Sequence, residues 1–556
     1  MQRIPQTTAT IFAMLLLALA VGFAQRDKAK QKTLAREPEV HRLPGATRSG
    51  RPAVAKTNTS GTLRLKIVDA DTKQPVFCRV DVVGADGNHY EPAENPLAPW
   101  SLHRLGNRID KGPFRYYGWF FYCNGTCDVA VPAGTIRVQV WKGFEYEPVV
   151  VTPTVTKNET TDVSVQLKRR TDMAARGWYS GDTHIHLDRR NETDNQRALD
   201  LAAAEDIRFA HILCMNDPRT YKPTMDAQIW YQTQGLGKKS ERFRGPYGIA
   251  SGQEYRCGTF GHICFVGGSR MVDADGLQTD PNNWPVFGLV ADELHSLGGY
   301  AFHAHGGYEK EIYADFAQEA TDGVELLQFA VYRGIGLEGW YHILNAGFRF
   351  PAVGASDYPY CRAFGDCRTY CRLGDIKPTF DTWNRAAAAG KSFVTTGPLL
   401  EVTVEGKHPG ETVSRRAGQH ELHVTVQLSS PVAPVDEIEL IVGGKIRTRR
   451  KLIGEDRTGP LTWKTTVSVD DSTWLAVRAF AKSGAGRENV EAHTNPVYVS
   501  LDGGKSRSHK NLTWLIAKLD ERIAYHAGRK FDEKSKVLSY FHKSREILTR
   551  MAEAAK

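Results

Sequence analysis

The stretch that decides the fold of the central region is GDTHIH at residues 181–186. Because strand side chains point alternately to opposite sides, His184 and His186 project to the same side if this stretch ends a strand. Two imidazoles on one side can hold a metal ion together. A lone His-x-His pair is weak evidence, since neighbouring histidines are also common on surfaces and in cores.

Three further clusters of acids and histidines strengthen the interpretation of this pair as metal ligands. Glu254 lies in SGQE and is followed by His262 in GH, His305 lies in AFHAHGG, and Asp357 ends GASD. A carboxylate such as Glu254 can bridge two cations, or it can be a buried acid paired with a base such as Arg256. Four clusters at the ends of predicted strands are difficult to explain by packing, so the sequence predicts a metal site.

Residues 171–397 alternate apolar runs with helix-like stretches, which favours an α/β domain containing a parallel sheet or barrel. Predicted strands include 209–214, 263–266, 300–302, 324–329 and 352–354, and predicted helices include 199–204 and 286–297. In such folds the functional groups collect at the carboxyl ends of the strands. His211 lies inside an apolar run and is predicted to be a core histidine.

The regions on either side of 171–397 have different patterns. Short alternating strands with turn signals predict β-sandwiches over 61–168 and 398–500, and an apolar stripe predicts a helical segment over 508–556. The segment VPAGTIRVQVWKG in the first sandwich resembles prealbumin-like modules, which are mostly non-catalytic.

The amino-terminal region predicts export. A charged start, an apolar run over 11–24 and small residues at its end are typical of a signal peptide over 1–24. About 14 apolar residues are too few for a membrane span, which needs about 20. The alternative is an uncleaved anchor. Residues 25–60 are polar and basic and predict a disordered linker. We therefore expect a secreted or periplasmic protein without stable membrane insertion after cleavage.

The charge argues against nucleic-acid binding. The chain has 556 residues, which predicts about three or four domains, and its net charge is +9. That charge lies in the tails: 26–60 carries +6 and 505–556 carries +7, whereas 61–504 carries −5. The predicted domains are mildly acidic as a group, so the basic whole-chain charge predicts no nucleic-acid partner.

The nine cysteines are expected to form disulfides in an oxidising compartment. We expect a disulfide among Cys361, Cys367 and Cys371, which would stiffen the loop after Asp357. Cys123 and Cys127 can form a local bridge. An odd number leaves at least one thiol free or paired between chains.

The motifs GDTHIH, GQE with GH, FHAHGG, GASD and GKSFVTTGPLL, with the late TNPVY, resemble those of the polymerase-and-histidinol-phosphatase (PHP) superfamily of metal-dependent hydrolases. They are most similar to its CehA/McbA branch, over roughly 171–500. The resemblance implies a distorted β/α barrel, flanked here by two β-sandwiches, with metals at the carboxyl ends of its strands.

Carried over by position, the resemblance implies two ions of Zn, Mn or Fe. One would be held by His184, His186, Glu254 and Asp357, and the other by Glu254, His262 and His305. His305 rather than His303 keeps the family's spacing from Gly298 and Gly299. Three positions of a third site in trinuclear members are not matched, in the stretches 187–192 and 214–217 and at Pro359. Because the other two sites are intact, we predict a two-metal centre.

The expected activity is hydrolysis of an ester-type bond: a phosphoester first, a carboxyl ester or carbamate second. Asp357 and Glu254 are the catalytic candidates. Arg333 either neutralises a substrate anion or pairs with a carboxylate, and Glu325 is a candidate for supporting a ligand. The substrate is a small molecule or part of the cell envelope, and the oligomeric state is left open.

The sequence also bears on two rival functions. A secreted glycan- or surface-binding protein with a vestigial barrel is the alternative, and the unmatched third site mildly favours it. A glycoside hydrolase would need a pair of catalytic carboxylates, for which the sequence offers no candidate pair.

Overall fold

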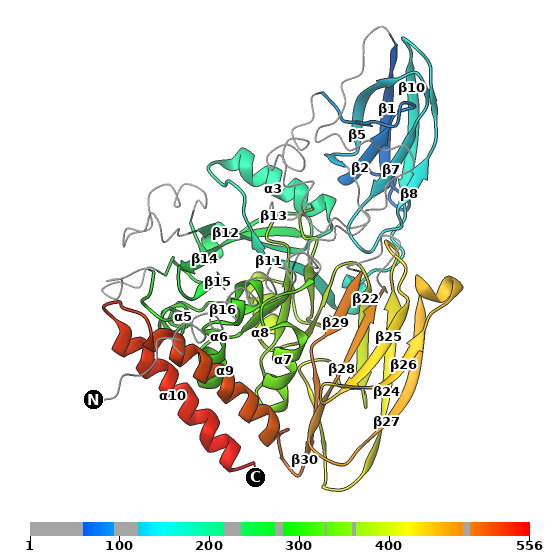
Figure 1. Cartoon of the computed structure of the whole chain (residues 1–556). Coiled ribbons are helices and arrows are strands. Elements are labelled where there is room, and N and C mark those ends of the chain that lie inside the picture. The colour runs from blue at the N-terminus through cyan, green and yellow to red at the C-terminus, as the bar shows by residue number, and fades with distance from the viewer. Residues whose placement is uncertain are drawn as a thin grey trace, which may run out of the picture.

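The structure, a computed structural model, describes residues 59–93, 120–215, 235–272, 282–328, 331–358, 363–481 and 490–555. Strands in several sheets dominate it, with a smaller number of helices (Figure 1). The β-rich, multidomain part of the predicted fold is therefore confirmed. The predicted signal peptide (1–24) and almost all of the predicted linker (25–60) lie outside the described residues. None of the described helices is long and apolar enough to cross a membrane.

The amino-terminal region is a sandwich of two sheets. Along β1 (Ser60–Asp69) buried and outward positions alternate, and Leu63, Leu65 and Ile67 enter a shared core with side chains of the opposite sheet. One sheet has the order β10-β1-β5, and the other has the order β3-β2-β7-β8 with β4 paired to β2. The remaining bounds are β2 (Cys78–Val83), β3 (His89–Tyr90), β4 (Phe121–Cys123), β5 (Thr126–Pro132), β6 (Gly134–Thr135), β7 (Arg137–Trp141), β8 (Val149–Val151), β9 (Thr154–Val155) and β10 (Thr160–Leu167).

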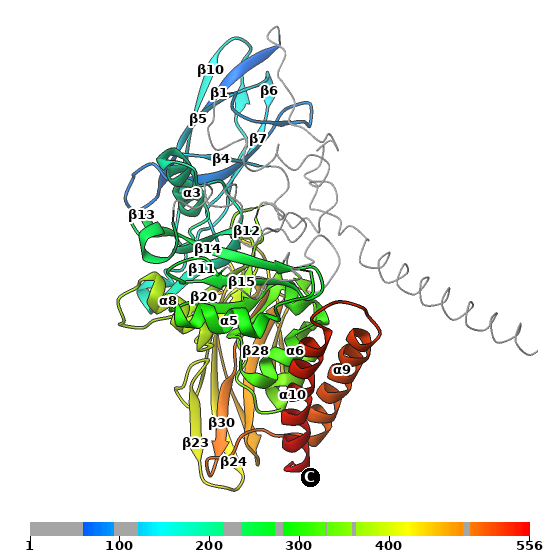
Figure 2. The same cartoon turned by 90° about the vertical axis from the view of Figure 1, so that its left-hand side faces the viewer.

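The central region is a mixed sheet with helices beside it (Figure 2). The pairs β11–β12, β12–β14, β16–β17 and β17–β19 are parallel. Its strands are β11 (Trp178–Ile185), β12 (Phe209–Met215), β13 (Arg242–Arg244), β14 (Tyr247–Cys257), β15 (Gly261–Val266), β16 (Tyr300–His303), β17 (Gly323–Gln328), β18 (Val331–Tyr332), β19 (Ala352–Ala355), β20 (Arg368–Arg372) and β21 (Ser392–Thr395). Its helices are α3 (Glu192–Ala204), α5 (Phe287–Ser296), α6 (Ile312–Asp315), α7 (Gly336–Asn345) and α8 (Phe380–Ala388).

The first central strand lies beside two later ones: β11 pairs with β20 in an antiparallel register, Gly181 lying opposite Thr369, and it also contacts the segment after β19. An isolated parallel bridge joins Ile185, at the end of β11, to Tyr358, just after β19. The backbone N–H of His186 also donates to the carbonyl of Tyr358 at 2.6 Å. The carboxyl ends of β11 and β19 are thereby held side by side.

The carboxy-terminal β region is continuous with the central sheet. β21 pairs with β29 in an antiparallel register, Val394 lying opposite His493. A separate three-stranded sheet, β22-β24-β27, packs its apolar side chains against this extension. The strands are β22 (Leu399–Val404), β23 (Thr412–Arg415), β24 (His420–Ser429), β25 (Glu437–Val442), β26 (Lys445–Lys451), β27 (Leu461–Val469), β28 (Thr473–Phe480), β29 (Glu491–Thr494) and β30 (Val497–Leu501).

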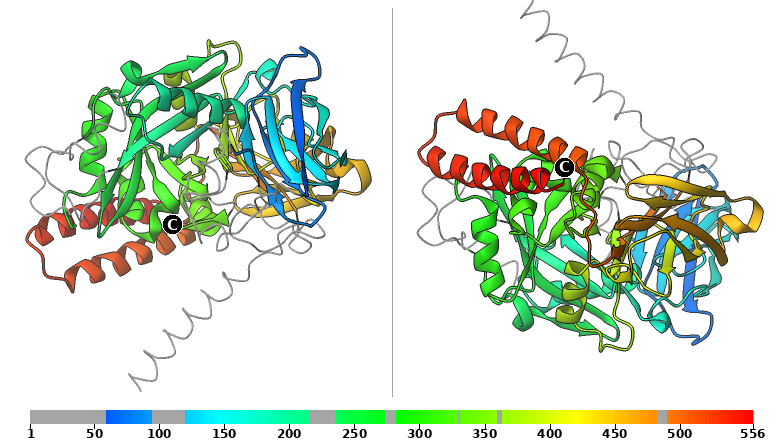
Figure 3. Two further views of the ribbon diagram at one scale, coloured as in Figure 1. Left: turned by 90° about the horizontal axis from the view of Figure 1, so that it is seen from above. Right: turned by 90° about the horizontal axis from the view of Figure 1, so that it is seen from below.

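The chain ends in a helical hairpin, α9 (His509–Ala527) and α10 (Lys534–Glu553). It lies against the central region, on the side away from the amino-terminal sandwich (Figures 1 and 3). Leu512, Leu515 and Phe541 are fully buried in the same core as α5 and α7. Tyr540 donates to Asp315 Oδ1 at 2.7 Å, so the hairpin is fixed by polar contacts as well as by packing.

Buried ion pairs join the amino-terminal sandwich to the central region. Arg79 of β2 lies 2.7 Å from Glu205, which follows α3, and both side chains are buried. Arg169 pairs with Asp206 through two hydrogen bonds of 2.8 and 2.9 Å and with Glu145 at 2.5 Å. Because a buried charge is costly without a partner, these pairs fix how the two regions meet.

Candidate metal centre

The His-x-His pair occupies the carboxyl end of β11. Thr183 and Ile185 alternate with the two histidines, so both imidazoles project to one side of the strand. Their Nε2 atoms lie 3.0 Å apart. The side chain of His184 is fully buried, and that of His186 is 9% exposed. The two rings thus present two ligand atoms at one place.

Glu254 of β14 places its carboxylate between the histidines. Its Oε1 lies 2.8 Å from His262 Nδ1, 3.5 Å from His184 Nε2 and 3.6 Å from His305 Nε2. Its Oε2 lies 3.4 Å from His186 Nε2. Burial raises the pKa of this carboxyl, but the surrounding histidines, His184 first, outweigh it and hold the pKa well below its usual range.

Asp357 and His305 complete the cluster from two loops with unusual backbone geometry. Asp357 Oδ1 lies 3.3 Å from the Nε2 atoms of both His184 and His186, and Oδ2 lies 3.9 Å from His305 Nδ1. The φ angles of His305 and Asp357 are 55° and 53°, in the left-handed region that non-glycine residues rarely adopt. Such strain is typical of positions where a side chain must be aimed.

All six residues predicted as metal ligands therefore lie together. Two overlapping groups have all their ligand atoms within 4.8 Å of one another: His184, His186 and Asp357, and His184, Glu254 and His305. Ligands about 2.0–2.2 Å from a tetrahedral ion lie about 3.4 Å from one another. The separations between these side chains, 2.8 to 3.9 Å, are close to that value. The residues present thus fit divalent cations.

Glu254 is also paired with a base, which was the alternative to a role as a metal ligand. Arg256, two residues further along the same strand face, approaches Glu254 Oε2 to 2.5 Å. This base contacts only one of the two oxygens, and Oε1 faces three histidines. The acid–base pair and the histidine cluster therefore share one carboxylate.

A second layer of side chains orients His184. Its Nδ1 lies 3.0 and 3.1 Å from the two oxygens of Glu325 and 3.2 Å from Cys264 Sγ, and all three side chains are fully buried. A carboxylate at Nδ1 directs the Nε2 lone pair toward the cluster. The sequence indicated Glu325 but missed Cys264. Cys264 lies on β15 directly opposite Glu254, and this strand register is not encoded by any local sequence pattern.

Asp182 supports the backbone at this point. Its Oδ1 accepts hydrogen bonds from the N–H groups of His184 and Ser356 at 3.0 and 3.1 Å. Burial raises the pKa of this carboxyl to about 7. One carboxylate therefore ties the ends of β11 and β19 together beneath the ligand cluster.

Arg333 is connected to the cluster through Gln328. It donates to Gln328 Oε1 at 3.3 Å, and the same oxygen lies 2.6 Å from His305 Nδ1. Tyr308, whose hydroxyl lies 3.3 Å from His262 Nδ1, was not indicated by the sequence. Gln328 was missed as well, because an amide in an apolar strand has no distinctive pattern.

Two other histidines have structural roles. His303 pairs with Asp315 of α6 at 3.0 Å. His211 is fully buried, its Nδ1 lies 3.2 Å from the carbonyl of Asp182, and desolvation lowers its pKa to about 4. The predicted core role of His211 is confirmed.

Parts of the predicted loop chemistry lie outside the described residues. These include Asn216, Asp217, Pro359 and Cys361, so the unmatched third-site positions and a disulfide to Cys361 are described only in part. Cys371 is a free, buried thiol. Cys123 and Cys127 are free thiols as well, so the local bridge between them is not formed in this structure.

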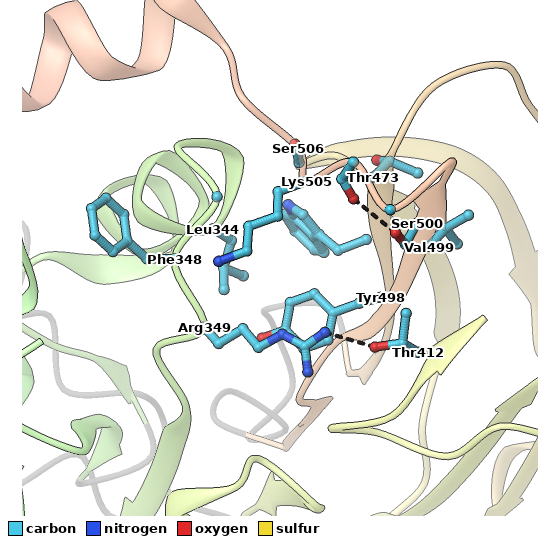
Figure 4. A pocket seen from close by; sticks show the side chains of 14 residues that line it. Leu344, Phe348, Arg349, Thr412, Thr473, Tyr498, Val499, Ser500, Lys505 and Ser506 are labelled. Atoms are coloured by element: carbon cyan, nitrogen blue, oxygen red, sulfur yellow. Dashed lines mark hydrogen bonds between the residues drawn. The ribbon is translucent and has the colours of Figure 1, made fainter. Parts of the chain in front are cut away.

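A cavity of about 140 Å³ lies elsewhere, between α7 and the β28–β30 end of the carboxy-terminal sheet (Figure 4). Arg349 lies over the ring of Tyr498, 4.3 Å from its centroid, and donates to Thr412 Oγ1 at 2.6 Å. The residues that line this cavity include none of the six in the candidate metal centre.

No protein-family model and no curated protein matches the chain. Among solved structures, PsfC from Pseudomonas syringae PB-5123 is 14% identical with a TM-score of 0.26, covering 39% of this chain and 90% of its own. The minor pilin GBS52 of Streptococcus agalactiae is 18% identical (TM-score 0.13; 20% and 46% covered), and a streptococcal ancillary pilin is 17% identical (0.13; 24% and 38%). The chain thus spans less than half of either pilin.

Proposed function

We propose that this protein is a metal-dependent hydrolase that cleaves an ester-type bond at a dinuclear site. The observation that carries the proposal is the convergence of His184, His186, Glu254 and Asp357 from three separate parts of the chain. Two adjacent divalent cations held there would supply a hydroxide nucleophile near neutral pH and stabilise negative charge that develops on the substrate.

We further assign it to the PHP superfamily, in its CehA/McbA branch, with a distorted barrel formed by the central strands. Three features support this assignment: the order of the motifs, the parallel pairs among the central strands, and the bridge that joins β11 to β19. Phosphoesters are the first candidate substrates, and carboxyl esters or carbamates are the second. Export would bring the enzyme to small molecules or cell-envelope material.

The residues of this chain have distinct roles in the proposed reaction. Glu254 would hold metal through its two carboxylate oxygens, and Asp357 would accept a hydrogen bond from the attacking water. Glu325 holds the ring of His184 in its productive orientation. Arg333 and Gln328 form a polar edge next to His305, where an anionic part of a substrate would be neutralised.

The test is elemental analysis of the purified protein joined to an activity screen. We expect about two equivalents of Zn, Mn or Fe, and turnover of a phosphomonoester, phosphodiester, aryl ester or carbamate. His184→Ala and Glu254→Ala should lose both metal and activity. His423→Ala, a 76% exposed histidine on β24, is the matched control and should lose neither.

Other outcomes would decide against the enzyme. Full turnover by either cluster variant would remove the metal hypothesis. A protein that binds no metal and turns over none of these substrates would instead support the alternative, a secreted glycan- or surface-binding protein.

A further inference from the structure

The cavity of about 140 Å³ at the end of α7 is built by three separate parts of the chain. The loop after α7 contributes residues 347–349, and the carboxy-terminal sheet contributes side chains of β23, β28 and β30. The third part is the segment 503–506, which leads from β30 toward α9. A ligand held in this cavity would therefore contact all three parts at once.

Much of the lining of this cavity is apolar. The side chains concerned are those of Leu344, Phe348, Trp474, Tyr498 and Val499. The indole N–H of Trp474 already donates to Asn345 Oδ1 at 2.8 Å, so it requires no polar partner from a ligand. A cavity of about 150 Å³ with apolar walls holds one benzene molecule. The volume here therefore suits a single six-membered ring.

Two cations line the cavity, and no acidic residue does. Figure 4 shows the side chain of Lys505 above the cavity and that of Arg349 below it. Arg349 donates to Thr412 Oγ1, which uses one of its five N–H donors. Within the part of the chain that the structure describes, neither cation forms an ion pair with an acid. The cavity thus offers positive charge that its own lining does not neutralise.

Backbone geometry brings Lys505 to the loop after α7. Gly347 has a left-handed φ of +95°, and a Cβ at this residue would lie 2.6 Å from the carbonyl oxygen of Ser506. A larger residue would push the two segments apart. The hydroxyl of Ser500 donates to the carbonyl of Gly504 at 2.9 Å and holds the turn that precedes Lys505. The fold therefore fixes where the lysine side chain begins.

We propose that this cavity binds a small aromatic carboxylate, with its ring against Leu344 and Trp474 and its carboxylate between Arg349 and Lys505. The planar guanidinium of arginine matches the two oxygens of a carboxylate, and the lysine ammonium adds a second positive charge. An aliphatic anion of the same charge would leave the apolar side chains facing water. The site is separate from the metal centre and does not depend on the proposed hydrolase activity.

The test uses the full-length protein with benzoate as the probe, and ligand-observed NMR measures the affinity. We expect saturable binding with a Kd at or below about 1 mM. Because the bound ring would contact three parts of the chain, benzoate should also raise the Tm. Benzamide, which has the same ring without the charge, should bind at least about tenfold more weakly. Acetate, which has the charge without the ring, should bind more weakly as well.

Variants assign the binding to this cavity. Arg349→Met and Lys505→Met each remove a charge and keep an unbranched side chain, and each should weaken benzoate binding at least about tenfold. Lys464→Met, which changes an exposed lysine on β27, is the matched control and should bind benzoate unchanged. His184→Ala, in the metal centre, should also bind benzoate as the unsubstituted protein does.

Three results would overturn this site. They are the absence of saturable binding, equal affinities for benzoate and benzamide, and binding that His184→Ala abolishes but Arg349→Met leaves unchanged. The last result would place benzoate at the metal centre. Comparison of benzoate with benzamide needs no variant, so poor folding of a variant would not leave the proposal undecided. Because the probe is not a substrate, failure here would leave the hydrolase proposal standing.

Discussion

Two buried groups of charges in this molecule differ in how they are neutralised. At the junction with the amino-terminal sandwich, Arg169 meets Asp206 through two hydrogen bonds and Glu145 through one. In the candidate metal centre, Glu254 and Asp357 face histidines, and Arg256 reaches one oxygen of Glu254. Arginine carries a permanent charge and five donors, so the junction is complete by itself. Imidazoles that give up a proton offer lone pairs, which suit an added cation.

The largest difference should come from removing the central carboxylate charge. Glu254→Gln is expected to lower kcat/KM by at least about 10³-fold and to release metal, because the carboxylate proposed to hold both ions is lost. Activity assays and elemental analysis measure both effects. Glu145→Gln, at the junction, should keep its metal. An active Glu254→Gln protein with full metal content would show that the charges of the candidate metal centre are not there to bind a cation.

Next in size is the removal of a junction acid. Asp206→Asn should cost about 3–5 kcal/mol of unfolding free energy, because Arg169 is left buried without its main partner. Urea unfolding monitored by circular dichroism gives this value, and metal content should be unchanged. Asp128→Asn, which breaks the exposed pair with Arg64, serves as the control with little expected loss. An equal loss in both variants would show that burial of the junction is unimportant.

A smaller effect is expected one layer behind the ligands. Glu325→Gln should weaken metal binding by about 10–100-fold, because His184 loses the carboxylate that orients its ring. Competition with a chelator of known affinity measures the change. Glu338→Gln, an 83% exposed acid on α7, provides the matched control. If Glu325→Gln binds metal as tightly as the unsubstituted protein, Glu325 is a packing residue.

The smallest effect is the contribution of the junction to the pH dependence of stability. Burial, with repulsion from Asp206, raises the pKa of Glu145 to about 7. The native state therefore holds a proton that the unfolded state has lost between about pH 4.5 and 7, so stability falls as pH rises through this window. We expect a loss of about 1–3 kcal/mol. Unfolding at pH 5 and pH 7.5 measures it as the difference between the unsubstituted protein and Glu145→Gln, whose dependence on pH should be smaller.

Local patterns predicted the strands well and their partners poorly. The run predicted at 209–214 is β12, and the one at 263–266 lies within β15. Alternation placed His184 and His186 on one side, as observed. The pairing of β21 with β29 was not foreseen, because it joins segments about a hundred residues apart and no periodicity encodes such a register.

The candidate site shows the same limit. Histidines and acids in short motifs pointed to all six side chains of the cluster. Cys264 and Tyr308 were missed because their approach depends on the β14–β15 register and on a left-handed turn at residues 305–308. Buried arginines such as Arg79 were missed too, since a lone basic residue in a strand is usually solvated.

The pairing of β21 with β29 has a consequence for how this protein can be divided or recombined. A polypeptide ending near residue 397 would leave the backbone N–H and C=O groups of Ser392–Thr395 without the strand that satisfies them. An unpaired strand edge of this kind can pair with strands of neighbouring molecules, which leads to aggregation. Recombination at that boundary would therefore yield protein fragments that aggregate. The central region and the carboxy-terminal β region should be kept together in one polypeptide.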